Sequence, residues 1–190
     1  MNVLFTANTE PDDVPNIPGL FYRPNYITKA EEQALLTAID AETWDTTWER
    51  RRQPYGASYG TGDRPPRPIP DWGTTLRDRL RRDGIGDFDQ MLVNEYLPGQ
   101  GIALHVDYDP FDRVVVSLSL SAPCVMDFRH VADDGRGALL LESRSLLILE
   151  DMARYDWKHG IARRKQDRWK GLVVPRKRRV SVTFRQLKRA

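Results

Sequence analysis

With 190 residues, of which 40% are hydrophobic and 29% charged, the chain has the composition of a globular protein long enough for one domain with a buried core. No apolar stretch reaches the length of a membrane span, and no basic segment precedes the first apolar residues as in a signal peptide. The single cysteine, Cys124, excludes an internal disulfide and a cysteine-rich zinc site. We therefore expect a cytoplasmic monomer without a membrane segment.

The net charge of +2 is unevenly distributed along the chain. Residues 1–47 carry eight Asp and Glu against two Lys and Arg, whereas residues 154–190 carry fourteen Lys and Arg against two Asp. Such asymmetry favours a polyanionic partner, and nucleic acid is the partner we expect. The alternative interpretation is an ordinary solvated basic surface.

The N-terminal half predicts an irregular segment followed by two helices. Residues 1–17 are polar and proline-rich, so we place the domain at residues 18–190. Residues 20–22 and 26–27 are typical of a short strand. Thr28 and Glu31 form a capping-box pattern, which predicts a helix over residues 29–40. A second helix is predicted over residues 76–82.

Residues 50–70, between the two helices, predict a lid-like loop. Residues 61–70 contain four prolines and a glycine, which excludes a helix or a central strand there. Arg50 and Arg51 begin this segment, and Tyr55 and Tyr59 are interleaved with glycines. We interpret the four residues as candidate substrate contacts, with the two tyrosines stacking on a base. The alternative for the tyrosines is ordinary packing under the loop.

The second half of the chain is predicted to form strands. Short apolar or alternating runs are separated by turn residues at residues 91–96, 114–120, 124–130, 137–141, 145–149 and 180–186. Two helices followed by many short strands indicate a mainly β (α+β) sandwich or barrel, with the N-terminal helices packed on one face.

A His-x-Asp pair offers two ligands for a metal ion. On an extended strand the side chains of His105 and Asp107 point to the same face and can bind one ion. The third ligand must come from His130 or His159, barring a second carboxylate. We favour His159, because His130 precedes a turn and resembles a surface residue. Two histidines and one carboxylate form the facial triad that binds Fe(II), although Mn, Co and Ni accept the same ligands.

A second polar pattern predicts an anion site. The period of two places Arg179, Ser181, Thr183 and Arg185 on one face of a strand, where two guanidiniums repel unless they face water or an anion. A dicarboxylate would satisfy them, because a guanidinium fork binds a carboxylate through two hydrogen bonds. The amide of Asn94 and the phenol of Tyr96 share a strand face and can reach the same ligand.

Five of these patterns, in this order, resemble the signature of the AlkB family of Fe(II)/2-oxoglutarate dioxygenases. They are Asn94-x-Tyr96, Pro98-Gly99, His105-x-Asp107, His159-Gly160 and Arg179-x-Ser181-x-Thr183-Phe184-Arg185. The resemblance extends over about residues 18–185. Residues 94–102, 116–120 and 125–128 are most similar to the branch that contains the animal tRNA wobble-uridine hydroxylases, whose RNA-recognition and methyltransferase domains have no counterpart in these 190 residues.

The resemblance implies a double-stranded β-helix (jelly-roll) core and a set of residue roles. His105, Asp107 and His159 would bind Fe(II). Arg179 would pair with the distal carboxylate of 2-oxoglutarate, helped by Asn94 and Tyr96. Arg185 would lie nearer the metal, bonded to Asp107 or to the cofactor's C1 carboxylate. O₂ would be the third requirement of the reaction.

The activity that follows from the resemblance is hydroxylation of alkylated or modified bases in nucleic acid, with release of succinate, CO₂ and, from an N-methyl group, formaldehyde. The base would have to be flipped out or single-stranded to reach the metal. A tRNA nucleoside hydroxylase is the first alternative, and a protein or small-molecule oxygenase is the second. The alternative that is not an enzyme is a binding module without a functional metal site.

Overall fold

The computed structural model describes residues 13–57 and 67–188. Within these residues the helices are α1 (Lys29–Ala41), α2 (Asp71–Arg82) and α3 (Asp151–Tyr155). The strands are β1 (Leu20–Arg23), β2 (Arg52–Gly56), β3 (Gln90–Tyr96), β4 (Ile102–His105), β5 (Val114–Leu120), β6 (Cys124–His130), β7 (Arg136–Leu141), β8 (Leu146–Glu150), β9 (Trp157–Ile161), β10 (Gln166–Trp169), β11 (Leu172–Pro175) and β12 (Arg179–Arg185). No described helix has the length and apolar character needed to cross a membrane.

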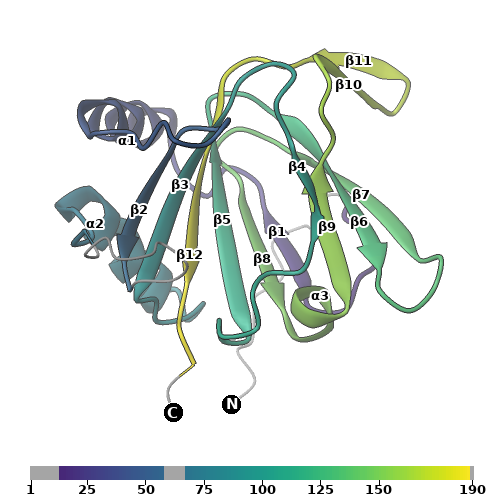
Figure 1. The fold of residues 1–190 in the computed structure, drawn as a ribbon, viewed down its shortest axis with the longest axis horizontal. Coiled ribbons are helices and arrows are strands. Elements are labelled where there is room, and N and C mark those ends of the chain that lie inside the picture. The colour runs from purple at the N-terminus through teal and green to yellow at the C-terminus, as the bar shows by residue number, and fades with distance from the viewer. Residues whose placement is uncertain (1–12, 58–66, 189–190) are drawn as a thin grey trace.

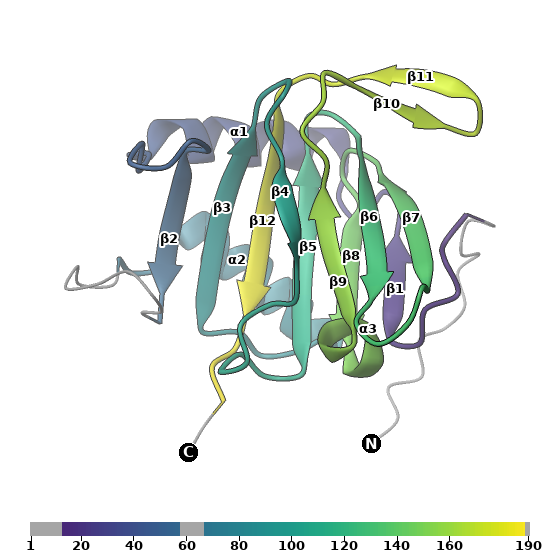
Figure 2. The same ribbon diagram turned by 45° about the vertical axis from the view of Figure 1, so that its right-hand side comes forward.

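Two antiparallel sheets face each other and form the sandwich predicted from the sequence. The six-stranded sheet has the order β1-β8-β5-β12-β3-β2, and the four-stranded sheet has the order β4-β9-β6-β7. Figure 2 shows α1 and α2 behind the six-stranded sheet and the four-stranded sheet in front of it. The hairpin of β10 and β11 projects beyond the sandwich (Figure 1). The jelly-roll expectation, with both N-terminal helices on one face, is confirmed.

Alternation of residues along the six-stranded sheet separates two hydrophobic cores. Val180, Val182 and Phe184 of β12 pack toward the helices, together with Ile39 of α1 and Leu80 of α2. The other face of this sheet contributes residues such as Leu147 and Leu149 of β8 to a second core, between the sheets. The polar residues of β12 therefore face the space between the sheets, which is where a site can form.

The start of α1 follows the predicted capping box. The Thr28 hydroxyl accepts a hydrogen bond from the Glu31 backbone N–H, and the Glu31 carboxylate accepts one from the Thr28 N–H. The second helix begins at Asp71 rather than at residue 76, because Trp72 continues the apolar repeat of Leu76 and Leu80 by one more turn toward Pro70. The short strand near the N-terminus comprises Leu20–Arg23 only, since Tyr26 has left the sheet to pack in the helix-side core.

The predicted loop over residues 50–70 needs a correction in its first part. Residues Arg52–Gly56 form β2, which pairs with β3 at the edge of the six-stranded sheet. Pro54 is compatible with this position because an edge strand leaves one row of backbone groups unpaired. Residues 67–70 are irregular, as predicted. Residues 58–66, including Tyr59, lie outside the described residues, as do residues 1–12 of the predicted irregular segment.

Candidate active site

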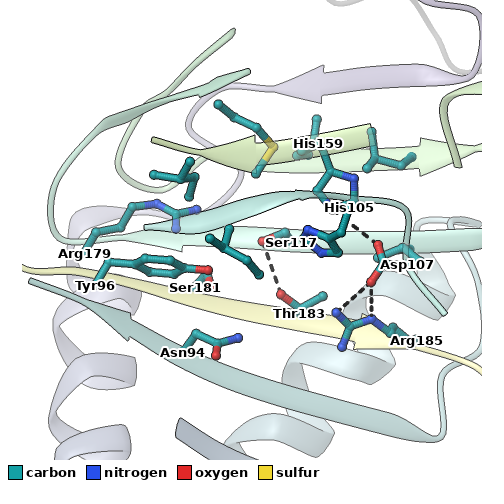
Figure 3. Close-up of a pocket in the computed structure, with 16 residues that line it drawn as sticks. Asn94, Tyr96, His105, Asp107, Ser117, His159, Arg179, Ser181, Thr183 and Arg185 are labelled. Carbon is teal, nitrogen blue, oxygen red and sulfur yellow. Dashed lines mark hydrogen bonds and ion pairs between the residues drawn. The ribbon is translucent and has the colours of Figure 1, made fainter. Parts of the chain in front are cut away.

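A cavity with about 520 Å³ of empty volume, part of it open to solvent, lies between the two sheets. Its polar lining comes from β3, β5, β9, β12 and the segment around β4, and its apolar wall comes from β4, β5, β6, β8 and β9. The polar and charged residues are Asn94, Tyr96, His105, Asp107, Ser117, His159, Arg179, Ser181, Thr183 and Arg185. The sequence prediction that β12 presents one polar face with two arginines is therefore confirmed (Figure 3).

The predicted metal ligands meet at one end of this cavity. His105 closes β4 and stands opposite His159 of β9 in the sheet register, and the two ring centroids are 4.5 Å apart. Ligand atoms of His105, Asp107 and His159 all lie within 4.8 Å of one another. Asp107 follows the end of β4 rather than lying within the strand, so its side chain is placed by the irregular segment after it.

His130, the competing ligand, does not join this cluster. It lies at the end of β6, where its Nδ1 is 3.0 Å from the carboxylate of Asp133. The preference for His159 over His130 agrees with this geometry.

The atoms of the cluster fit a metal ion. Asp107 Oδ2 is buried without a hydrogen-bond partner in the described part of the chain, and His159 Nε2 lies 3.4 Å from it. His105 Nδ1 is 2.9 Å from the carbonyl oxygen of Ala103. A proton on Nδ1 satisfies that contact and leaves the Nε2 lone pair for a metal, the usual arrangement of a ligating histidine. These three side chains would hold the ion.

The electrostatics keep the ligands in their binding forms. Burial alone would raise the pKa of the Asp107 carboxyl, but Arg185 and the two imidazoles outweigh burial and hold this pKa well below its usual range. At His159 burial dominates and lowers the pKa to about 4, despite the attraction of Asp107. Near neutral pH Asp107 is therefore ionised and His159 is neutral, as metal binding requires.

Arg185, on β12 of the six-stranded sheet, forms an ion pair with the carboxylate of Asp107. Its Nε and Nη2 lie 3.0 and 2.9 Å from Asp107 Oδ1, so the guanidinium occupies one carboxylate oxygen and leaves Oδ2 to the cluster. The structure thus supports the placement of Arg185 at the metal end of the cavity.

Arg179 lies at the opposite end of the same strand face, next to Tyr96 (Figure 3). It is 2% exposed, and its Nη2 donates to Ser119 Oγ at 2.8 Å. Its Nε is buried without a partner among the described residues, so the guanidinium retains donors for an anion. Ser119 was missed from the sequence, although the alternation of Ser117 and Ser119 in an otherwise apolar strand was an available signal.

The predicted substrate contacts largely have other roles. Arg51 forms two hydrogen bonds, of 2.5 and 2.7 Å, with the buried carboxylate of Glu95, which faces the helices rather than the cavity. Tyr55 is 3% exposed in the helix-side core and meets Trp72 edge-to-face. Tyr55 is therefore a core residue that cannot stack on a base, and Arg51 is engaged with Glu95; neither side chain lines the cavity.

Arg50 lies near Tyr96 and Arg179, at the end of the cavity opposite the candidate metal ligands. Its guanidinium carbon is 5.2 Å from the centre of the Tyr96 ring, and that of Arg179 is 5.3 Å from the same ring. Arg50 also donates to the carbonyl oxygen of Gly101. These contacts tie the segment before β2 to the start of β4.

A triad of two histidines and one carboxylate, set between jelly-roll sheets with an arginine at the far end of the cavity, defines the class of metal- and 2-oxo-acid-dependent oxygenases. The comparison with family models agrees, since residues 19–185 match the 2OG-Fe(II) oxygenase superfamily. The chain belongs to this superfamily and, within it, to the AlkB-like dioxygenases.

Named relatives support this assignment, and a solved structure shares the fold. The chain is 35% identical to the Arabidopsis thaliana "Alkylated DNA repair protein ALKBH8 homolog", over 93% of this chain and 60% of that protein. It is 36% identical to the Xenopus tropicalis "tRNA (carboxymethyluridine(34)-5-O)-methyltransferase alkbh8", over 79% of this chain but only 26% of that protein. It is 31% identical to the Bos taurus mitochondrial "Alpha-ketoglutarate-dependent dioxygenase alkB homolog 7", over 87% of this chain and 77% of that protein. Among solved structures, OsALKBH1 matches the fold with a TM-score of 0.68 at 19% identity, covering 89% of this chain and 98% of that one.

Proposed function

We propose that the protein hydroxylates alkylated or modified bases in nucleic acid, using Fe(II), 2-oxoglutarate and O₂. The observation that carries the proposal is the complete triad of His105, Asp107 and His159, joined by one strand face to the free donors of Arg179. The bound iron and 2-oxoglutarate would supply the oxidising chemistry. The names of several relatives, which include DNA repair, RNA/DNA demethylation and tRNA modification, support nucleic acid as the substrate.

The protein's own residues would orient the reactants. Arg185 would hold Asp107 ionised and aimed at the metal, and Arg179 with Tyr96 would fix the far carboxylate of the cofactor. The apolar wall, which includes Met126 and Ile161, would keep water away from the reacting carbon. Because this cavity lies between the sheets, the base would enter only after leaving a stack or from a single strand.

The basic charge of the C-terminal part is partly neutralised by acidic residues of the same chain. Several of its basic side chains pair with acids from the N-terminal part of the chain: Lys170 with Asp13, Arg178 with Asp40, and Arg163 with Glu49. Lys165, Arg168 and Lys177 form no ion pair with the described residues, and all three lie in or next to the β10–β11 hairpin. We propose that this hairpin, rather than the whole basic segment, contacts nucleic-acid phosphates.

Replacing Lys165, Arg168 and Lys177 together with Gln is expected to weaken binding of single-stranded nucleic acid and to make that binding less salt-dependent. Three lost phosphate contacts would reduce the slope of log K against log salt by roughly 2. Fluorescence anisotropy at several salt concentrations measures both effects. A control that replaces Arg77, Arg81 and Arg82 of α2 with Gln removes the same charge from the far side of the six-stranded sheet. An equal loss in the two triple variants would contradict a hairpin contact.

The experiment that tests the function is mass spectrometry of methylated DNA, methylated RNA and total tRNA after incubation with the protein, Fe(II), ascorbate and 2-oxoglutarate, together with succinate release. Loss of a methyl group with formaldehyde would support demethylation. Succinate release without any change in nucleic acid would contradict the proposed substrate and indicate a protein or small-molecule oxygenase. Sedimentation analysis of the same sample tests the monomer that we propose.

A second candidate function is hydroxylation of a tRNA nucleoside. It is favoured by the 36% identity to a relative named for tRNA carboxymethyluridine chemistry, although this chain spans only about a quarter of that protein. A gain of one oxygen on a tRNA nucleoside, without formaldehyde, would distinguish it from demethylation.

A further inference from the structure

A buried arginine lies beside the metal cluster without being one of its ligands. Arg154 of α3 is 1% exposed and ranks first by size among the fully buried side chains of the described residues. It stands five positions before His159, at the end of the fold where β9 begins (Figures 1 and 2). No carboxylate forms an ion pair with it within residues 13–57 and 67–188.

Among the described residues, the Arg154 guanidinium donates hydrogen bonds to backbone carbonyls of one short segment. Its Nη1 donates to the carbonyl oxygen of Asp107 at 2.9 Å. Its Nη2 donates to the carbonyl oxygens of Tyr108 at 2.8 Å and of Phe111 at 3.3 Å. The guanidinium therefore spans the chain from the metal ligand itself to the fourth residue after it.

The later part of this segment is held by backbone hydrogen bonds, since the Asp112 N–H donates to the Gln186 carbonyl oxygen and the Lys188 N–H donates to that of Pro110. β4 ends at His105 and β5 begins at Val114, so the residues between them take no part in a strand ladder. Their sheet-like contact is the isolated bridge between Phe111 and Leu187. Nearer the cluster, Arg154 donates directly to the carbonyl oxygen of Asp107 and so ties this end of the segment to α3.

We propose that Arg154 is a positioning residue for Asp107: it fixes the main chain of the ligand while Arg185 fixes its carboxylate. Burying a guanidinium without an ion pair is costly, and here the Nε of Arg154 is also buried without a partner among the described residues. A hydrophobic side chain of similar length would fill the same space without that cost. Such a side chain could not donate hydrogen bonds to three carbonyl groups. We therefore explain the buried arginine by its role in holding the segment in place. The proposal rests on the metal site, not on the identity of the substrate.

The test is binding of Mn(II) alone, without 2-oxoglutarate or nucleic acid, followed through the electron paramagnetic resonance signal of free Mn(II). Arg154→Met is expected to raise the Mn(II) Kd by about 10-fold to 100-fold, the range for removing a residue that orients a metal ligand. Arg154→Lys keeps the charge and part of the hydrogen bonding, so its Mn(II) Kd should lie between those of the parent and of Arg154→Met. Because no substrate is present, this result is independent of the proposed function.

Leu80→Ala is the matched control for lost stability. Leu80 is fully buried in the helix-side core, so its truncation should lower the melting temperature while the Mn(II) Kd stays within about twofold of the parent value. The proposal is overturned if Arg154→Met binds Mn(II) like the parent, or if Leu80→Ala weakens binding as much at a similar loss of melting temperature. It is also overturned if even Arg154→Lys fails to fold, because the residue would then serve overall stability.

Discussion

Asp107→Ala should reduce succinate formation by more than about 100-fold. Loss of an outer residue that merely orients a ligand commonly costs 10-fold to 100-fold in metal affinity or activity, and loss of the ligand itself should cost more. The variant also leaves the guanidinium of Arg185 without its ion-pair partner, at a site where Asp107 is 7% exposed. The remaining histidines would then share the pocket with an uncompensated positive charge, which disfavours a cation further.

Succinate release in the presence of saturating Fe(II) and 2-oxoglutarate measures this effect. Asp109→Ala is the matched control, because Asp109 lies two residues further on, is 84% exposed at its side chain, and pairs only with Lys188 among the described residues. The control should retain the parent rate. Undiminished turnover by Asp107→Ala would mean that the metal, if one is used, lies elsewhere.

Features of the fold that depend on neighbouring residues could be predicted from the sequence. The capping box of Thr28 and Glu31 is a local pattern, and it correctly marks the start of α1. The polar face of β12 is also predictable, because a shift by one residue would turn Val180, Val182 and Phe184 into the cavity. The same alternation is sufficient to place the arginines at both ends of β12 on the cavity side.

Features that depend on long-range pairing could not be read in the same way. Tyr55 lies in a stretch rich in glycine and proline that is typical of a loop, and only its pairing opposite Met91 in the sheet reveals a strand. That pairing also decides which face receives Tyr55, so the sequence favoured a base-stacking role where the structure has a core residue. The four residues of β4 are similarly too short to be recognised without β9 beside them.

The charge distribution shows how composition can mislead. Residues far apart in the chain, such as Arg178 just before β12 and Asp40 of α1, neutralise each other in the folded chain. Others, such as Arg176 with Asp167 of β10, form buried ion pairs. The surface available for a polyanion is therefore smaller than a count of Lys and Arg indicates.

Arg179→Met is expected to raise the KM for 2-oxoglutarate by about 10-fold to 100-fold. The variant would remove the charge-assisted interaction that we propose with the distal carboxylate, and a hydrogen bond to a charged group contributes roughly 1.5–3 kcal/mol. Arg179 lies at the end of the cavity opposite Asp107, so the rate at saturating 2-oxoglutarate should change much less than the KM (Figure 3). The KM of Arg179→Lys should lie between those of the parent and of Arg179→Met, because an ammonium keeps the charge but cannot form two parallel hydrogen bonds with a carboxylate.

The adjacent arginine provides the control for this prediction. Arg178 lies just before β12 and its guanidinium turns to the other side of the sheet, where Nε is 2.5 Å from Glu95 and Nη1 is 3.0 Å from Asp40. Arg178→Met should therefore lower stability and leave the KM for 2-oxoglutarate unchanged. If both variants raised the KM equally, a general disturbance of β12 would explain the result and the distal carboxylate would need another partner. A KM change confined to Arg179 would show that the cofactor lies along the strand face, because only the residue on that face responds.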